Sequence, residues 1–231
     1  MVDLVKTNES GGAWYPVPIN QLDSLLTKVI SSGHGYQHTY PLRRNIAYNL
    51  QHIEFLHKCL SDIKLSSVLK TQTWKSILLV GCGVMESLLH YLLVKKSAHS
   101  TTEWELKIVM PGNQKKMDGV QSKVDSFIYK KLPSPKAKQM NFDTIIQKAK
   151  SNKILGSNPG IYSKLDKLRK LRNKVHLQAI DNPTDTDWNS FNKSEVNDMD
   201  EILYSVFTSS IFRPSAHEKS YFQYLYDYYK T

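Results

Sequence analysis

The sequence predicts an all-α protein, a helical bundle that carries one small β-hairpin insertion. Three observations support this prediction. Apolar residues recur at spacings of three and four through most of the chain, as they do on one face of a helix. The segment 74–94 is apolar on all sides, which is typical of the central helix of a bundle. The segment 97–140 departs from this pattern, because apolar and polar residues alternate on both sides of a turn that contains glycine and lysine.

The length of 231 residues suits one domain with an insertion. We expect an N-terminal segment with a short helix (1–40), a helical domain (41–212) that contains the inserted hairpin (97–140), and an aromatic C-terminal tail (213–231). Because 40% of the residues are hydrophobic, the chain is neither disordered nor membrane-embedded as a whole. Its formal charge of +10 favours polyanionic partners.

The first helices are expected at 20–30 and from Pro41 to about Leu60, where apolar residues recur at helical spacing. His34 and His38 lie between them, and histidines four residues apart on a helix suit zinc. The neighbouring glycines and Pro41 favour a loop instead, and no cysteine or acidic residue nearby completes a metal site. We therefore expect neither a metal nor a cofactor.

The segment 74–94 approaches the length of a membrane span. Glu86, His90 and two glycines interrupt it, so we expect a buried helix of a protein without a membrane segment. The N-terminus lacks the charged and apolar regions of a signal peptide. The two cysteines, Cys59 and Cys82, have no paired spacing, which favours reduced thiols. These features predict a cytoplasmic protein.

Glu86 places a carboxylate inside this apolar segment. A buried carboxylate and a guanidinium satisfy each other, so we expect Glu86 to pair with Arg172 or Arg169. The alternative is that Glu86 faces solvent at an edge of the bundle. Small residues at 81–83, one turn earlier, indicate the close approach of another helix.

The insertion is rich in lysine. Between 107 and 153 the chain has eleven lysines and three aspartates, with no glutamate or arginine. Trp104, Phe127 and Tyr129 lie among these charges and can stack on bases. The alternative is a solvated lysine-rich surface on an inserted ribbon. The candidate RNA-binding residues are Lys107, Lys115, Lys116, Lys123, Lys130 and Lys131.

A helix capped by Asn141 is expected next, followed by the most informative helix, Leu165 to Gln178. On a helix, Arg172 falls within the apolar stripe that contains Leu165 and Leu168. A buried, unpaired guanidinium costs about 3–5 kcal/mol, so the fold must supply an anion, carbonyl oxygens or a wet cavity there. His176 follows Arg172 by four residues, so that both side chains reach one rim of the helix.

At these residues the chain resembles the HEPN superfamily of helical, nucleotide- and RNA-associated domains. The family motif is an arginine, four to six residues and a histidine, often with asparagine directly after the arginine. Arg172 is followed by Asn173 but is separated from His176 by only three residues, whereas Arg169 is followed by Lys170 and is separated from His176 by six. Either Arg169 or Arg172 can therefore correspond to the arginine of the family motif.

The resemblance implies an all-α HEPN-like bundle with a metal-independent endoribonuclease site shared across a homodimer. The implied catalytic residues are Arg169, Arg172, Asn173 and His176, with Glu86 in a supporting role. It also implies a toxin or antiviral-defence effector, with an antitoxin or defence-system partner, whose product is a 2′,3′-cyclic phosphate. The alternative is a non-catalytic HEPN module that binds RNA or acts as a scaffold, and the acidic segment 181–201 favours an antitoxin-like or scaffold subunit.

Overall fold

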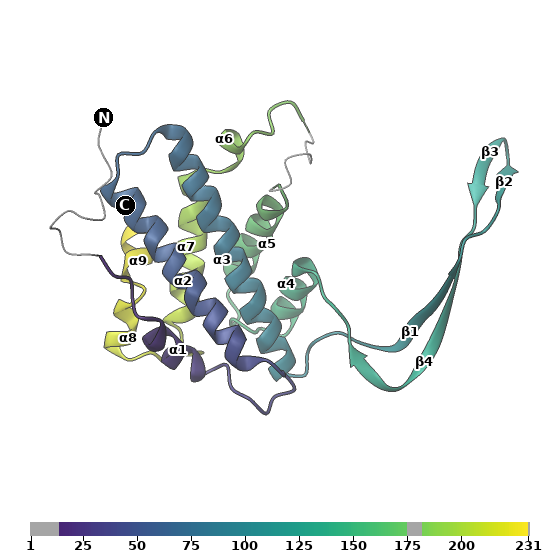
Figure 1. Ribbon diagram of the computed structural model, residues 1–231, viewed down its shortest axis with the longest axis horizontal. Helices are drawn as coiled ribbons and strands as arrows, with labels where there is room; N and C mark the ends of the chain where they lie inside the picture. Colours follow the sequence, from purple (N-terminus) through teal and green to yellow (C-terminus); the bar gives the residue numbers. More distant parts are fainter. Residues whose placement is uncertain (1–13, 175–181, 231) are drawn as a thin grey trace, which may run out of the picture. The chain divides into compact units, whose positions relative to one another are not determined.

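The computed structural model describes residues 14–174 and 182–230 (Figure 1). The described residues form two compact units, a strand unit at His99–Asn141 and a helical unit made of the chain on both sides of it. Of the described residues, 57% are helical and 14% are in strands. The prediction of an all-α protein was therefore wrong, and the chain is mixed α/β.

The strand content exceeds that of one small hairpin because the insertion forms two antiparallel sheets. These pair β1 (Thr101–Met110) with β4 (Ser126–Ala137), and β2 (Gln114–Met117) with β3 (Val120–Lys123). The strand pairing breaks between the two sheets, at Gly112, where a Cβ atom would overlap the carbonyl oxygen of Val124. Only glycine lets the two backbones approach this closely.

The tip of the strand unit is a two-residue turn. Asp118 and Gly119 connect β2 to β3 and both have positive φ angles, 51° and 81°. A type I′ turn requires positive φ at both central residues, and Asp-Gly is among the sequences that adopt it most readily. The turn sets the register of the second sheet, in which Met117 lies opposite Val120.

The helical unit is built around α3 (Ser67–Lys95), which crosses its centre in Figure 1. It packs against α2 (Thr39–Asp62), α4 (Phe142–Ser151), α5 (Pro159–Asn173), α6 (Asp187–Ser190) and α7 (Lys193–Phe207). By length and composition α3 is able to cross a membrane, but 61% of its most apolar 18-residue window is buried within the protein. Such burial is consistent with the core helix of a soluble protein.

The helix α3 begins seven residues earlier than the apolar run that starts at Trp74. Ser66 caps it, because its side chain accepts a hydrogen bond from the backbone N–H of Leu69 at 3.4 Å. At Gly81 an added Cβ would lie 2.6 Å from the sulfur of Met199 on α7. The expected close approach of another helix at 81–83 is thus confirmed at Gly81.

The two ends of the described chain form short helices that pack on the helical unit. The helix α1 (Ile19–Thr27) packs on α2, and the C-terminal segment forms α8 (Ala216–Ser220) and α9 (Gln223–Lys230). The helix α9 packs on α7 and α2, and its Leu225 is fully buried. The aromatic tail therefore docks on its own chain.

Candidate functional site

The helix that carries the candidate residues, α5, has a well-defined start. Asn158 caps it by accepting a hydrogen bond from the backbone N–H of Gly160 at 2.9 Å, and Pro159 occupies the first turn. Leu165 and Leu168 are buried against the core, as the apolar stripe predicts. The described helix ends at Asn173. The predicted continuation to Gln178 lies outside the described residues.

Arg172 forms an ion pair with Glu86 of α3. Its Nη2 atom lies 2.9 Å from Oε2 of Glu86, which confirms the expected pairing and identifies the arginine that takes part. The guanidinium carbon also lies 6.0 Å from the centre of the Phe142 ring. The side chains of Arg172 and Glu86 are 38% and 25% exposed, so the pair is partly solvated rather than buried. Its contribution to stability is correspondingly smaller.

Cys82 is fully buried in the apolar core, one turn before Glu86 on α3. Its thiol donates to the carbonyl oxygen of Leu168 across 3.8 Å, which joins α3 to α5. Burial raises the pKa of Cys82 to about 12, while the charge of Arg172 lowers it and that of Glu86 raises it. A thiol with so high a pKa is a poor nucleophile at neutral pH, so Cys82 has a packing role here.

Arg169 has different partners. Its Nη2 atom lies 2.8 Å from Asp166 on the same helix and 3.2 Å from Asp143 on α4, and only 17% of its side chain is exposed. The structure therefore does not bring Arg169 and Arg172 to one carboxylate. Arg169 braces α5 against α4, whereas Arg172 faces Glu86 of α3.

The other two candidate residues follow Arg172 in the chain. Asn173 is exposed at the last position of α5. His176 lies outside the described residues.

A groove of about 600 Å³ runs along the polar face of α5. Lys174 pairs with Asp185 at 2.8 Å across it, and Lys167 pairs with Glu195 at 3.1 Å. Three lysines and three carboxylates line this groove in total, so their charges cancel. The groove therefore offers a polyanion no net electrostatic attraction.

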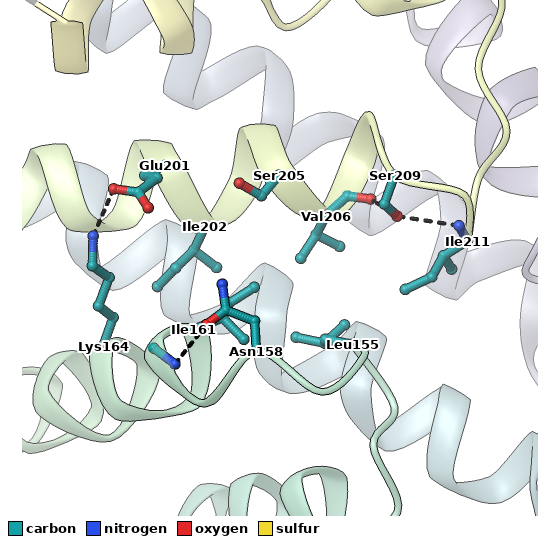
Figure 2. Close-up of a pocket in the computed structure, with 11 residues that line it drawn as sticks. Leu155, Asn158, Ile161, Lys164, Glu201, Ile202, Ser205, Val206, Ser209 and Ile211 are labelled. Atoms are coloured by element: carbon teal, nitrogen blue, oxygen red, sulfur yellow. Dashed lines mark hydrogen bonds and ion pairs between the residues drawn. The ribbon is translucent and has the colours of Figure 1, made fainter.

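A smaller cavity of about 190 Å³ lies between α5 and α7 (Figure 2). Ile161, Ile202 and Val206 form its apolar walls, and the ion pair of Lys164 with Glu201 at 2.6 Å closes one end. Asn158, Ser205 and Ser209 add polar groups to the lining, and Asn158 is already engaged as the cap of α5. Because its charged groups are paired, the cavity indicates imperfect packing between two helices rather than a reactive site.

The six candidate RNA-binding lysines all lie on the strand unit, and all are exposed. Lys107 pairs with Glu105 at 2.8 Å and Lys123 with Asp125 at 2.9 Å. Lys131 is 4.0 Å from Glu103. Lys115 and Lys116 lie on β2 and Lys130 on β4. Exposed pairs of this kind contribute little energy, so they leave the lysines able to meet phosphate groups.

A buried histidine–aspartate pair in the described part of the chain was not predicted from the sequence. His57 on α2 and Asp200 on α7 are 5% and 0% exposed, and the Nε2 and Oδ1 atoms lie 3.0 Å apart. Burial raises the pKa of Asp200, an effect that the hydrogen bond from His57 opposes. Among the described residues, neither Nδ1 of His57 nor Oδ2 of Asp200 has a hydrogen-bond partner.

The sequence offered only a weak signal for this pair. Asp200 belongs to an acidic segment that reads as a solvated surface, and His57 competes with Leu56 for the apolar face of its helix. The rings of Tyr224 and Tyr228, both on α9, lie against His57, and their centres are 5.4 Å and 4.6 Å from the centre of the imidazole ring. The pair is thus a buried polar link between three helices.

In the described parts of the chain, no group of three or more His, Cys, Asp or Glu side chains is arranged to hold a metal ion. No family model, curated protein or solved structure matches the chain. Inferences about function therefore depend on its own residues.

Proposed function

We propose that the chain is a metal-independent endoribonuclease of the HEPN type, which acts as a homodimer in the cytoplasm. The main support is the position of Arg172. Glu86 holds its guanidinium at 2.9 Å, and 38% of its side chain remains exposed at the end of α5. His176 follows four residues later in the sequence.

The chemistry requires few groups. A histidine whose pKa is near neutral removes the proton from a ribose 2′-hydroxyl, and the 2′-oxygen then attacks the adjacent phosphorus. The bond from phosphorus to the 5′-oxygen breaks, and a second histidine, supplied by the other subunit, protonates that oxygen. The products are a 2′,3′-cyclic phosphate and a 5′-hydroxyl. Arg172 neutralises the charge that builds up on the phosphate.

The contacts favour Arg172 over Arg169 as the phosphate ligand. Two carboxylates hold Arg169, and its side chain is only 17% exposed. Among the described residues, Arg172 has one carboxylate partner, Glu86, and its side chain is more than twice as exposed as that of Arg169. The proposed site therefore uses the short spacing to His176, with Arg169 as a structural brace.

The second candidate function is a non-catalytic module that binds RNA or acts as a scaffold. It is favoured by the observation that both arginines already form ion pairs within the helical unit. In that case Glu86 and Arg172 are a structural link between α3 and α5. Either function suits a toxin or antiviral-defence effector with a protein partner, the biological setting that we propose.

One experiment separates the two functions. Purified protein is incubated with end-labelled RNA in EDTA, and the product ends are identified by mass spectrometry. We expect cleavage that leaves a 2′,3′-cyclic phosphate, and loss of cleavage in His176→Ala and Arg172→Ala. The matched control is His34→Ala, which removes an exposed loop histidine. Cleavage by well-folded His176→Ala would refute this mechanism, and an inactive wild-type protein would favour the binding module.

A further inference from the structure

The strand unit exposes an unusual number of large apolar side chains. Phe127, Tyr129 and Trp104 are 55%, 53% and 52% exposed, and Leu106 and Val109 are nearly as open. A two-stranded ribbon is only marginally stable in water unless its apolar face is covered. The strand unit therefore has a surface suited to a binding partner.

The pairing register places these residues on one face. From Ser126 to Lys131, β4 pairs with β1 residue by residue except for one extra residue in β1, at Lys107. Since successive side chains of a strand point to opposite faces, Phe127, Tyr129 and Lys131 share a face. Their cross-strand partners Val109, Leu106 and Trp104 lie on it too. We call this set the aromatic face.

The three rings form a ladder along the ribbon. Phe127 and Tyr129 are two residues apart, and Trp104 lies opposite Lys131, one further step along β4. Two residues of a strand span roughly 6.7 Å. Stacked bases are about 3.4 Å apart, so each ring can fit between two successive bases of a single strand. The opposite face presents the pairs of Met110 with Ser126, Ile108 with Ile128 and Glu105 with Lys130, which carry no aromatic ring.

The charge of the strand unit favours a nucleic acid over a second copy of the chain. Residues 99–141 contain eight lysines and four acidic residues, which gives a net charge of +4. Two such units repel each other, whereas a polyphosphate backbone is attracted. Lys131 shares the aromatic face and lies opposite Trp104, where a phosphate can meet it between stacked bases.

We propose that the aromatic face binds single-stranded RNA by interleaving Phe127, Tyr129 and Trp104 with unpaired bases. Duplex RNA is excluded because its bases are already stacked on each other and present no open face. This inference rests on the proposed function only in taking RNA as the ligand.

The test measures the affinity of the full-length protein for a fluorescein-labelled single strand of about eight nucleotides, by fluorescence anisotropy. The probe carries 2′-O-methyl groups, so that it cannot be cleaved. We expect Tyr129→Ala to weaken binding about tenfold, within the range of about 5- to 150-fold that one stacking contact of about 1–3 kcal/mol gives. Tyr129→Leu keeps apolar area without a ring and should weaken binding almost as much, whereas Tyr129→Phe should bind like the wild type.

The matched control is Ile128→Ala, on the opposite face of the same strand, which should bind within about twofold of the wild type. Equal affinity for the single strand and its duplex would overturn the proposal. So would equal losses in Tyr129→Ala and Ile128→Ala with a change from dimer to monomer in light scattering, because a second copy would then cover the ribbon. RNA binding that depends on Tyr129, together with no cleavage of unmodified RNA in the EDTA assay, would remove the nuclease proposal and leave this one standing.

Discussion

Replacing Glu86 with glutamine tests whether the ion pair with Arg172 stabilises the contact of α3 with α5. Glutamine keeps the size of the side chain and one acceptor oxygen, so the change removes mainly the charge. A fully buried pair that loses one partner costs about 3–5 kcal/mol. An exposed pair contributes about 0.2–1 kcal/mol. With exposed fractions of 25% and 38%, the pair is intermediate, and we expect a loss of about 1–2 kcal/mol.

The assay is urea and thermal unfolding of the wild type, Glu86→Gln, Arg172→Gln and the double variant. For a chain of this length, a loss of 1–2 kcal/mol lowers Tm by roughly 2–8 °C. The double-mutant cycle should yield a coupling energy of about 1 kcal/mol. Asp62→Asn is the matched control, because Asp62 pairs with Lys58 at the same distance, 2.9 Å, but in an exposed position. We expect it to leave the stability unchanged within the error of the measurement.

Three results would contradict this reasoning. An unchanged Tm in Glu86→Gln would show that the pair does not contribute to stability. A coupling energy near zero would show that each side chain acts through other neighbours. A loss above about 3 kcal/mol would instead indicate that the pair is buried, contrary to the exposures found here.

Three further predictions concern the helical unit. The ion pair with Lys28 and the backbone N–H of Ser215 hold the pKa of Glu218 at about 2, below its ordinary 4.5. This stabilisation is present above pH 4.5 and is lost as the pH falls towards 2. Between pH 6 and pH 3 the free energy of unfolding should therefore fall by roughly 1 kcal/mol more in the wild type than in Glu218→Gln. An equal fall in both proteins would contradict this. Gly83→Ala should stabilise the fold by about 0.5–1 kcal/mol, because a Cβ at this position meets no other atom. Gly81→Ala should be less stable than Gly83→Ala by about 1–3 kcal/mol, because its Cβ meets Met199. The reverse order of stability in urea unfolding would disprove the close packing at Gly81. Asp200→Ala should cost about 1–3 kcal/mol because His57 loses its buried partner, and a neutral effect on Tm would argue against that link.

Much of the helical unit was predictable from local patterns. Apolar periodicity indicated α2 and α5, because a helix buries the residues that recur every three or four positions, and the continuous apolar run at 74–94 indicated α3. The pairing of Glu86 with an arginine also followed from the sequence, since a charge within an apolar stripe needs an opposite charge nearby. Alternation of apolar and polar residues indicated the strands of the insertion, although their extent and their division into two sheets were not foreseen.

Only the tertiary structure decided which charges meet. Arg169 and Arg172 lie three residues apart on one helix, yet the first faces Asp143 of α4 and the second faces Glu86 of α3. The partial exposure of the second pair likewise depends on how neighbouring helices cover it. His57 and Asp200 are 143 residues apart in the sequence, and each alone looks like an ordinary polar surface residue. Their contact depends on the packing of α2 against α7 and α9, which no local pattern encodes, because periodicity shows which face of a helix is buried but not which helix will cover it.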